Sequence, residues 1–482
     1  MKKWLPAALL SCSLCLPAAA NNVRVVIESA EPYNAIIEVK WENAWNLTDS
    51  VNNHDAVWVF FKSGHIGGSH PHAYIRNCTM LSDGTIKLSE DRVGTMLMPF
   101  VGAHEQISLK FRVDFNEMWQ GQLHVHAVEM VYCPPGQFYA GDGRANNTFA
   151  SSSGEPFLVS DTIISFHTRK GNFTIINPTA DLVADSLKTS AFPTGVQGFY
   201  VMKYEINQKQ FAAFLDSQNA NDLRQLIPEF SGMTYILGDV RFRSAIQIDE
   251  NTSASNSVHI TVVTGQTGNG ENRAVSYLNW DLLASYLDWS GLRPMTELEY
   301  EKACRGPKKP LKYEFAWGTQ YVSSIDSLDA DGTVDETTLQ IAADTVGLAI
   351  CSKPVGNPYV IGSARNGFAG RRGSSRIHVG AGYYSAFELS GNVWDMCVKV
   401  GHTAHDFNGA HGDGTLKEGA GANVAGWPTS NGIIAKGGGW NSLIVNKLDY
   451  QFRDLAVSDR FYVSQDYSSK RNTMGGRGCR SF

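Results

Sequence analysis

The sequence predicts an α+β protein in which a small β domain, residues 21–126, precedes a larger domain with few helices and many loops, residues 127–482. Three observations support this prediction. Segments that alternate apolar and polar residues dominate the first part, helix signals with complete N-terminal caps occur in the second, and glycine-rich segments fill much of the rest. Of the 482 residues 43% are hydrophobic and 18% charged, which is enough apolar material for more than one core.

The first twenty residues have the pattern of a bacterial-type secretory signal. Lys2 and Lys3 precede an apolar run that ends in three alanines at Ala20. We therefore expect cleavage after Ala20 and an exported protein in the periplasm, on the outer-membrane surface or in the medium. The alternative is lipid attachment at Cys12, although Leu10 fits a lipobox poorly. No later segment is long and apolar enough to predict a transmembrane helix.

Six cysteines would remain after this cleavage. In an exported protein they could form three disulfides, with about 15 possible connectivities. Their wide spacing contains no CxxC pattern, so a zinc site built from cysteines is not expected. The six are Cys78, Cys133, Cys304, Cys351, Cys397 and Cys479.

The first domain is predicted to be an immunoglobulin-like β-sandwich. Segments 36–41 and 106–115 alternate apolar and polar side chains, which places one face of each strand in a core and the other in water. Short strands at such spacing, separated by turn residues, are typical of this architecture. Further strand candidates between them are 57–61, 73–80, 85–90 and 95–100.

Three helices are predicted in the second domain by their capping residues. Asn207 and Gln210 can form a capping box within segment 205–215, and Thr296 and Glu299 can form another within segment 291–306. The acidic residues that follow Thr296 suit the N-terminal turn of a helix, so they need no catalytic explanation. The middle helix lies within segment 279–291, where Gly291 can take the left-handed position at the end. Short strands are expected at 313–318, 392–400 and 435–440.

Seven segments of the second domain occur in a fixed order. They are PPGQFYAGDG (134–143), GFYVMKYEINQKQFAAFL (198–215), RPMTELEYEKACRG (293–306), FAWGT (315–319), ELSGNVWDMC (388–397), KGGGWN (436–441) and GGRGCR (475–480). Together they resemble the sulfatase-modifying-factor or formylglycine-generating-enzyme-type domain, a variant of the C-type-lectin-like fold. The resemblance covers roughly residues 127–482 and rests on an ordered series of motifs.

The resemblance implies an oxidase site whose ligands are replaced in this chain. Aerobic members of the family bind copper through two cysteines after the glycine-rich turn and oxidise a cysteine of a target protein. Those positions fall on Ser442 and Lys447 here, and neither a hydroxyl nor an ammonium group is a good copper(I) ligand. A second branch holds iron with three histidines of an added helical domain. The added domain here is β-rich, and the alternation around His124 and His126 indicates that both face away from a core.

Two other groups of residues could hold a metal ion. His402, His405 and His411 lie in one glycine-rich loop, where imidazole could bind a divalent transition metal, but such loops also occur in relatives for purely structural reasons. Asp329 and Asp331 offer hard oxygen ligands for calcium, although the EF-hand pattern is incomplete. The family commonly holds structural calcium, so calcium is an expected cofactor without an assigned position.

The last part of the chain collects residue types that anchor recognition surfaces. The candidates are Trp440, Asn441, Arg453, Arg460 and Tyr462. In relatives this part of the fold forms a ligand-facing groove, so we expect these residues to bind a partner, although Trp440 and Arg453 could equally hold the core together.

The leading hypothesis is an exported envelope protein whose formylglycine-generating-enzyme-like domain is not catalytic and binds a protein or glycan partner. The alternative is a metal-dependent oxidative modifier of a secreted protein that uses the His402, His405 and His411 loop. A third possibility is a surface diversified for ligand capture. The formal charge of −6 and the absence of basic runs argue against nucleic-acid binding. No P-loop, dinucleotide fingerprint or nucleophile elbow supports nucleotide or hydrolase chemistry.

Overall fold

The computed structural model consists mostly of strands with five helices in its described part, which confirms the α+β class. The structure describes residues 23–47, 52–65, 68–144, 146–160, 165–169, 182–186, 191–232, 234–251, 257–262, 270–333, 335–338, 345–352, 360–370, 374–401, 406–442 and 454–482. The predicted signal segment therefore lies outside the described residues.

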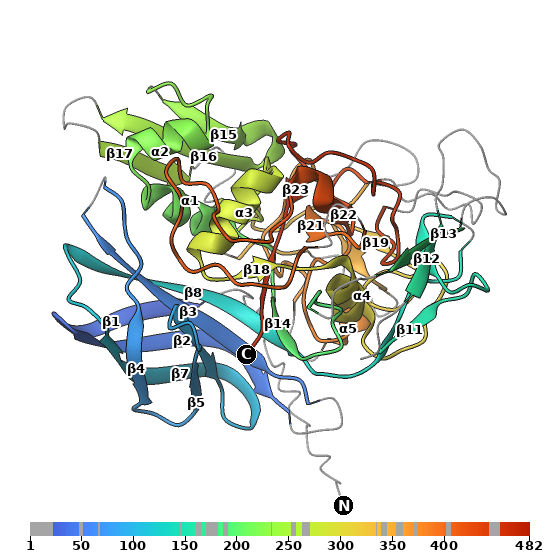
Figure 1. The fold of residues 1–482 in the computed structure, drawn as a ribbon, viewed down its shortest axis with the longest axis horizontal. Coiled ribbons are helices and arrows are strands. Elements are labelled where there is room, and N and C mark those ends of the chain that lie inside the picture. The colour runs from blue at the N-terminus through green and yellow to red at the C-terminus, as the bar shows by residue number, and fades with distance from the viewer. Residues whose placement is uncertain are drawn as a thin grey trace, which may run out of the picture.

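The N-terminal part contains a four-stranded antiparallel sheet, at the lower left of Figure 1. Its two long central strands carry the alternation expected from the sequence, since Ile37, Val39 and Trp41 are fully buried while Glu38 and Lys40 between them are half-buried. The order of strands is β1 (Arg24–Glu31), β2 (Asn34–Asn46), β7 (Gly102–Phe115) and β4 (Ile75–Met80).

A seven-stranded sheet joins the N-terminal part to the rest of the molecule. Strand β3 pairs with β8 along its whole length, and β8 also pairs with β14 at its C-terminal end. The sheet therefore crosses residue 126, where the sequence predicts a domain boundary. The order of strands is β18 (Arg293–Pro294), β24 (Gly478–Arg480), β14 (Phe199–Met202), β8 (Gln122–Cys133), β3 (Asp55–Gly64), β6 (Gly94–Met98) and β5 (Thr85–Leu88).

Strand β3 contributes to two cores because both faces of this sheet are covered. Val57, Val59 and Phe61 pack with the four-stranded sheet, which gives a two-sheet sandwich. Trp58 and Phe60 point to the opposite face and pack with residues of the helices. The sequence of a strand buried on both faces is a continuous apolar run, as in VWVFF at residues 57–61.

The helices begin where their caps predict. The capping boxes Asn207–Gln210 and Thr296–Glu299 are both formed, and Gly291 has a positive φ of 69°. In Figure 1, α1 and α3 lie above strand β8. The helices are α1 (Gln208–Asp216), α2 (Ala220–Leu226), α3 (Trp280–Trp289), α4 (Glu297–Arg305) and α5 (Arg376–Val379), with short 3₁₀ helices at Val240–Phe242 and Ser430–Gly432.

Five small sheets complete the described fold. The strand expected at 392–400 is present as β21. The strand expected at 435–440 overlaps β22 only at residues 435–436, and segment 313–318 forms turns and no strand, so that prediction is wrong. The sheets are β9 (Phe138–Ala140) with β11 (Phe157–Val159); β10 (Thr148–Ala150), β12 (Ser165–Arg169) and β13 (Leu182–Ser186); β15 (Tyr235–Asp239), β16 (Ser244–Asn251) and β17 (Ser257–Val262); β19 (Ser323–Ser324) with β20 (Leu348–Ala349); and β22 (Ile433–Lys436), β21 (Trp394–Val398) and β23 (Met474–Gly475).

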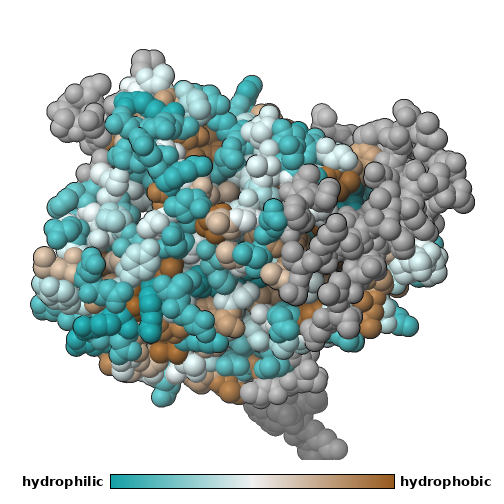
Figure 2. All heavy atoms as spheres, in the orientation of Figure 1, coloured by the Kyte–Doolittle hydropathy of each residue, from teal (hydrophilic) through white to brown (hydrophobic). Residues whose placement is uncertain are grey.

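The surface carries hydrophobic residues in small groups. On the face shown in Figure 2, brown spheres are scattered between larger teal areas. Scattered apolar residues are normal for a protein surface and do not by themselves indicate a contact site.

Candidate functional site

The position that the resemblance assigns to the first copper-binding cysteine is built from a tight turn. The backbone N–H of Ser442 donates to the carbonyl of Gly439 (2.9 Å), and the N–H of Gly439 donates to the Ser442 hydroxyl (3.0 Å). Ser442 is only 3% exposed. Burial and the nearby Asp459 raise the pKa of Asp454 to about 7, whereas a hydrogen bond with Ser442 lowers it. The second position, Lys447, lies outside the described residues.

This donor set does not fit copper(I). The groups at the turn are a hydroxyl, already engaged by a backbone N–H, and the Asp454 carboxyl group, and both are hard oxygen donors. Copper(I) prefers soft sulfur ligands. The described part of this site therefore lacks the ligand chemistry on which the family's oxidation depends.

Two of the predicted recognition residues are buried, so the expectation that they form an exposed surface is wrong. Trp440 is 5% exposed, stacks on Phe242 with ring centroids 5.7 Å apart, and donates from Nε1 to the Asn472 carbonyl (3.0 Å). Arg460 is 3% exposed and donates through two nitrogens, each at 2.8 Å, to the carboxylate of Glu297.

The other three predicted recognition residues differ in how exposed they are. Asn441 is exposed, Tyr462 is half-buried with its ring against the edge of Trp394, and Arg453 lies outside the described residues. Only Asn441 and part of Tyr462 are available on the surface in the described part of this group.

The carboxylates of α4 serve ion pairs within the fold. Glu297 pairs with Arg460, Glu299 with Arg293 and Glu301 with Arg305, and all six side chains are at most 4% exposed. Each pair ties α4 to another part of the chain or to its own next turn. These acidic residues are therefore structural, as the sequence indicates, although the sequence does not reveal their buried partners.

Carboxylates of the predicted calcium loop form ion pairs with two arginine side chains. The carboxylate of Asp331 lies 2.9 Å from both Arg243 and Arg273, and the Glu336 carboxylate binds the same two guanidinium groups. Burial alone would raise the pKa of Glu336, but these cations hold it below its ordinary value. Asp329 is exposed, and its backbone pairs with Thr337. Calcium at Asp331 would meet two positive charges, so the residues present do not fit this ion.

Of the three histidines of the predicted metal loop, His402 and His405 lie outside the described residues. His411 is half-buried, and its Nε2 accepts a hydrogen bond from the Ser481 backbone (2.9 Å). Burial, together with Arg480 and Arg293, holds the pKa of His411 well below its ordinary value. Among the described residues no group of three or more His, Cys, Asp or Glu side chains is arranged to hold a metal.

All six cysteines beyond the predicted signal are unpaired, so the expected disulfides are absent from the described residues. Five are buried, and burial raises the pKa of Cys304 and Cys351 to about 12. A protonated, enclosed thiol is a poor nucleophile and a poor metal ligand.

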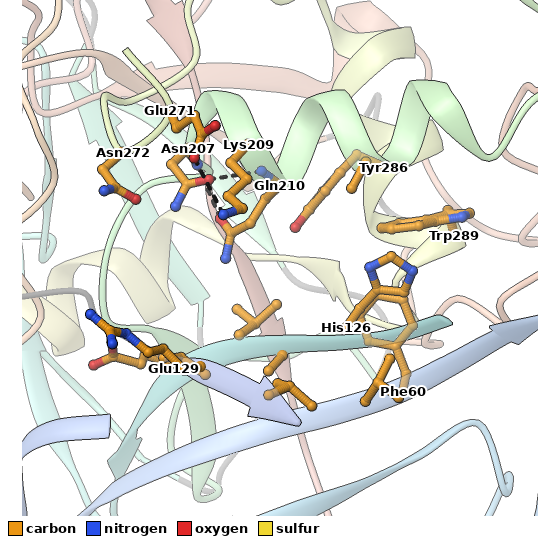
Figure 3. A pocket seen from close by; sticks show the side chains of 17 residues that line it. Phe60, His126, Glu129, Asn207, Lys209, Gln210, Glu271, Asn272, Tyr286 and Trp289 are labelled. Atoms are coloured by element: carbon orange, nitrogen blue, oxygen red, sulfur yellow. Dashed lines mark hydrogen bonds and ion pairs between the residues drawn. The ribbon is translucent and has the colours of Figure 1, made fainter. Parts of the chain in front are cut away.

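A pocket of about 540 Å³ lies between strand β8 and helices α1 and α3, and Figure 3 shows its lining. One end is aromatic. The ring of His126 stacks on Phe60 (centroids 5.0 Å apart), and both rings contact Trp289, at 4.8 Å and 5.1 Å. Tyr286 stands beside Trp289, one turn earlier on α3, with its hydroxyl toward the pocket.

The other end of the pocket is polar. Asn207, Lys209 and Gln210 at the start of α1 face Glu129 of β8 across the cavity (Figure 3). One oxygen of Glu129 accepts from the buried Lys203 (2.9 Å), and Lys203 also contacts Asp55 (3.2 Å). Burial raises the pKa of Asp55 to about 7.

Three buried polar atoms at this pocket have no hydrogen-bond partner among the described residues. They are His126 Nε2, Trp289 Nε1 and Glu129 Oε1. Burial and the nearby charge of Lys62 lower the pKa of His126 to about 3, so the imidazole is neutral near pH 7. A buried polar group without a partner costs about 1–3 kcal/mol and calls for a water or ligand.

The sequence does not predict this pocket. His126 faces away from the sandwich core, as the alternation in LHVHA indicates, but that face meets α1 and α3 and not water. The signal that could have identified it is the β8 segment HAVEMVYC, in which a histidine and a glutamate interrupt an otherwise apolar strand.

Comparison with known families agrees with the resemblance seen in the sequence. The family model for the sulfatase-modifying factor enzyme 1-like domain matches residues 118–480. This range includes β8, α1 and α3, whereas β1 and β3 precede it. The described part of the chain has no helix with the length and hydrophobicity needed to span a membrane. No curated protein matches the chain. The chain belongs to the sulfatase-modifying factor enzyme 1-like family.

Proposed function

We propose that this chain is an exported bacterial envelope protein whose formylglycine-generating-enzyme-like domain is not catalytic and binds a protein or glycan partner. An N-terminal sandwich of immunoglobulin type would present that domain. The observation that carries this proposal is the turn at Ser442, where a hydroxyl stands in place of a copper-binding thiol.

The surroundings of Ser442 support loss of the oxidase chemistry. The hydroxyl accepts from the N–H of Gly439 and lies next to Asp454, so it forms part of a closed hydrogen-bond network. At 3% exposure it does not present an open ligand position. A family domain that retains its framework without the soft ligand at this turn is better suited to binding than to oxygen-dependent oxidation.

The described residues offer no observation that favours the alternative of a relocated metal site. Of the three loop histidines, the structure describes only His411, whose Nε2 already accepts from Ser481. That nitrogen would have to release the backbone N–H before it could bind a metal.

In-cell cross-linking followed by mass spectrometry tests the binding function. We expect one protein or glycan-bearing partner to be enriched over a strain that carries an unrelated exported protein. Metal analysis of the purified protein tests whether the metal-dependent oxidation has been lost. We expect neither copper nor iron at one equivalent. Stoichiometric copper or iron that disappears on His405→Ala would overturn the proposal in favour of catalysis.

A further inference from the structure

We propose that the pocket between β8, α1 and α3 binds a neutral saccharide. This inference rests on the proposed binding function and assigns it a position and a ligand class. The pocket volume of about 540 Å³ falls within the range of about 300–1,000 Å³ that is usual for small-molecule sites.

The aromatic end of the pocket is a rigid, nearly closed apolar wall. Phe60, Tyr286 and Trp289 are at most 3% exposed, and their rings are fixed by mutual edge and tilted contacts. Rigid Tyr and Trp side chains supply contact area at low entropic cost. The C–H face of a sugar ring is flat and apolar, so it can pack against such a surface.

The polar end offers both donors and acceptors for hydroxyl groups. In the capping box, Asn207 Oδ1 and Gln210 Oε1 accept backbone N–H groups, and the two amide nitrogens are donors with no hydrogen-bond partner among the described residues. The Gln210 amide nitrogen points toward the cavity in Figure 3. Glu129 Oε1, without a partner among the described residues, is an acceptor. A hydroxyl group both donates and accepts, so a polyhydroxylated ring matches this mixture.

The charges of the lining favour a neutral ligand. The charged side chains are two cations, Arg24 and Lys209, and two anions, Glu129 and Glu271. Lys209 pairs with Glu271 at 3.3 Å, and Glu129 with the buried Lys203. The two cations and two anions of the lining balance, so the lining has no net charge to select a charged group, and the neutral His126 adds none.

The unpartnered atoms of the aromatic end provide an independent indication of a ligand. Trp289 Nε1 is a donor, and His126 Nε2 is a donor or an acceptor according to its tautomer. Both are enclosed, and neither has a hydrogen-bond partner among the described residues. A sugar in the pocket would place a ring or exocyclic oxygen beside the His126 nitrogen.

A glycan array that carries neutral and charged oligosaccharides, followed by calorimetry with the best binder, tests this assignment. We expect binding of neutral sugars that is insensitive to salt. Gln210→Glu preserves the capping box but removes the amide donor, so binding should weaken about tenfold or more. Tyr286→Phe, which removes only a hydroxyl, should weaken it severalfold. Gln225→Glu, the same change at an exposed position of α2, should have no effect.

Two results would overturn the assignment: no neutral sugar binds, or Gln210→Glu, shown to be folded by its melting temperature, binds as well as Gln225→Glu. A cross-linked partner that is still captured by Gln210→Glu would refute the saccharide site and leave the binding function intact. Binding of charged glycans alone would also count against it.

Discussion

Replacement of Arg460 by alanine should destabilise the protein by about 3–5 kcal/mol, the usual cost of breaking one half of a buried ion pair. The side chains of Arg460 and Glu297 are 4% and 0% exposed. Two of the guanidinium nitrogens donate to Glu297, one of them also donates to the Val400 carbonyl, and the group lies 4.2 Å above the ring of Phe149.

The magnitude follows from what is left behind. Without Arg460, the Glu297 carboxylate remains buried with the Val400 N–H (2.7 Å) as its main remaining partner. A loss of about 3–5 kcal/mol is a large part of the total stability of about 5–15 kcal/mol that proteins commonly have. With an m value of about 3 kcal/mol/M, the urea midpoint should fall by about 1–1.7 M.

Arg241→Ala is the matched control for this experiment. Arg241 also pairs with a carboxylate, Asp239, but its side chain is 83% exposed. Exposed pairs contribute about 0–1 kcal/mol, so the midpoint should hardly move. Replacing Arg460 and Glu297 together by methionine and glutamine should be less harmful than Arg460→Ala, because no charge is left alone. Equal midpoints for Arg460→Ala and Arg241→Ala would refute the reasoning.

Three further predictions follow from buried groups. Below pH 6.5 the unfolded His126 is protonated, whereas the folded imidazole stays neutral down to a pKa of about 3, so stability is lost as pH falls. Between pH 7.5 and pH 5 the free energy of unfolding of the wild type, measured by urea melts, should therefore fall by about 2 kcal/mol more than that of His126→Phe. Parallel pH profiles of the two unfolding free energies would contradict this. Gly412→Ala should lower the free energy of unfolding by about 1–3 kcal/mol, because the added Cβ would lie 2.4 Å from the backbone of Asp288 in α3. An unchanged melting temperature would show that the loop moves to accommodate the methyl group. Dithiothreitol should leave the melting temperature unchanged, since the six cysteines beyond the predicted signal are unpaired; a clear decrease would reveal disulfides.

Local features of this fold could be predicted from the sequence. The capping boxes at Asn207 and Thr296 involve residues three positions apart, so the sequence contains all the information needed. The alternation in β2 and β7 likewise indicates which side chains face the sandwich core.

Features that depend on distant partners could not be predicted. The sequence suggests that Arg460 is a surface recognition residue, because Glu297, with which it forms a buried ion pair, lies 163 positions away. The face of β8 that carries His126 looks solvent-exposed because the sequence does not show that α1 and α3 cover it. The Asp331 loop suggests calcium because the arginines that bind it are far upstream.

The candidate pocket combines both kinds of information. The sequence predicts helices α1 and α3 and the alternation of β8, but only the fold brings the amides of α1 opposite Glu129 and the rings of α3 over His126. Its unpartnered nitrogens and carboxylate oxygen become visible only when the surrounding packing is known.

Mass spectrometry of a cysteine-containing sulfatase peptide, incubated aerobically with the copper-treated protein, tests the central claim most directly. Because Ser442 provides a hydrogen-bonded hydroxyl where the family binds copper through sulfur, we predict that the peptide keeps its cysteine. Conversion of that cysteine to the aldehyde at a rate above that of copper alone would contradict the account.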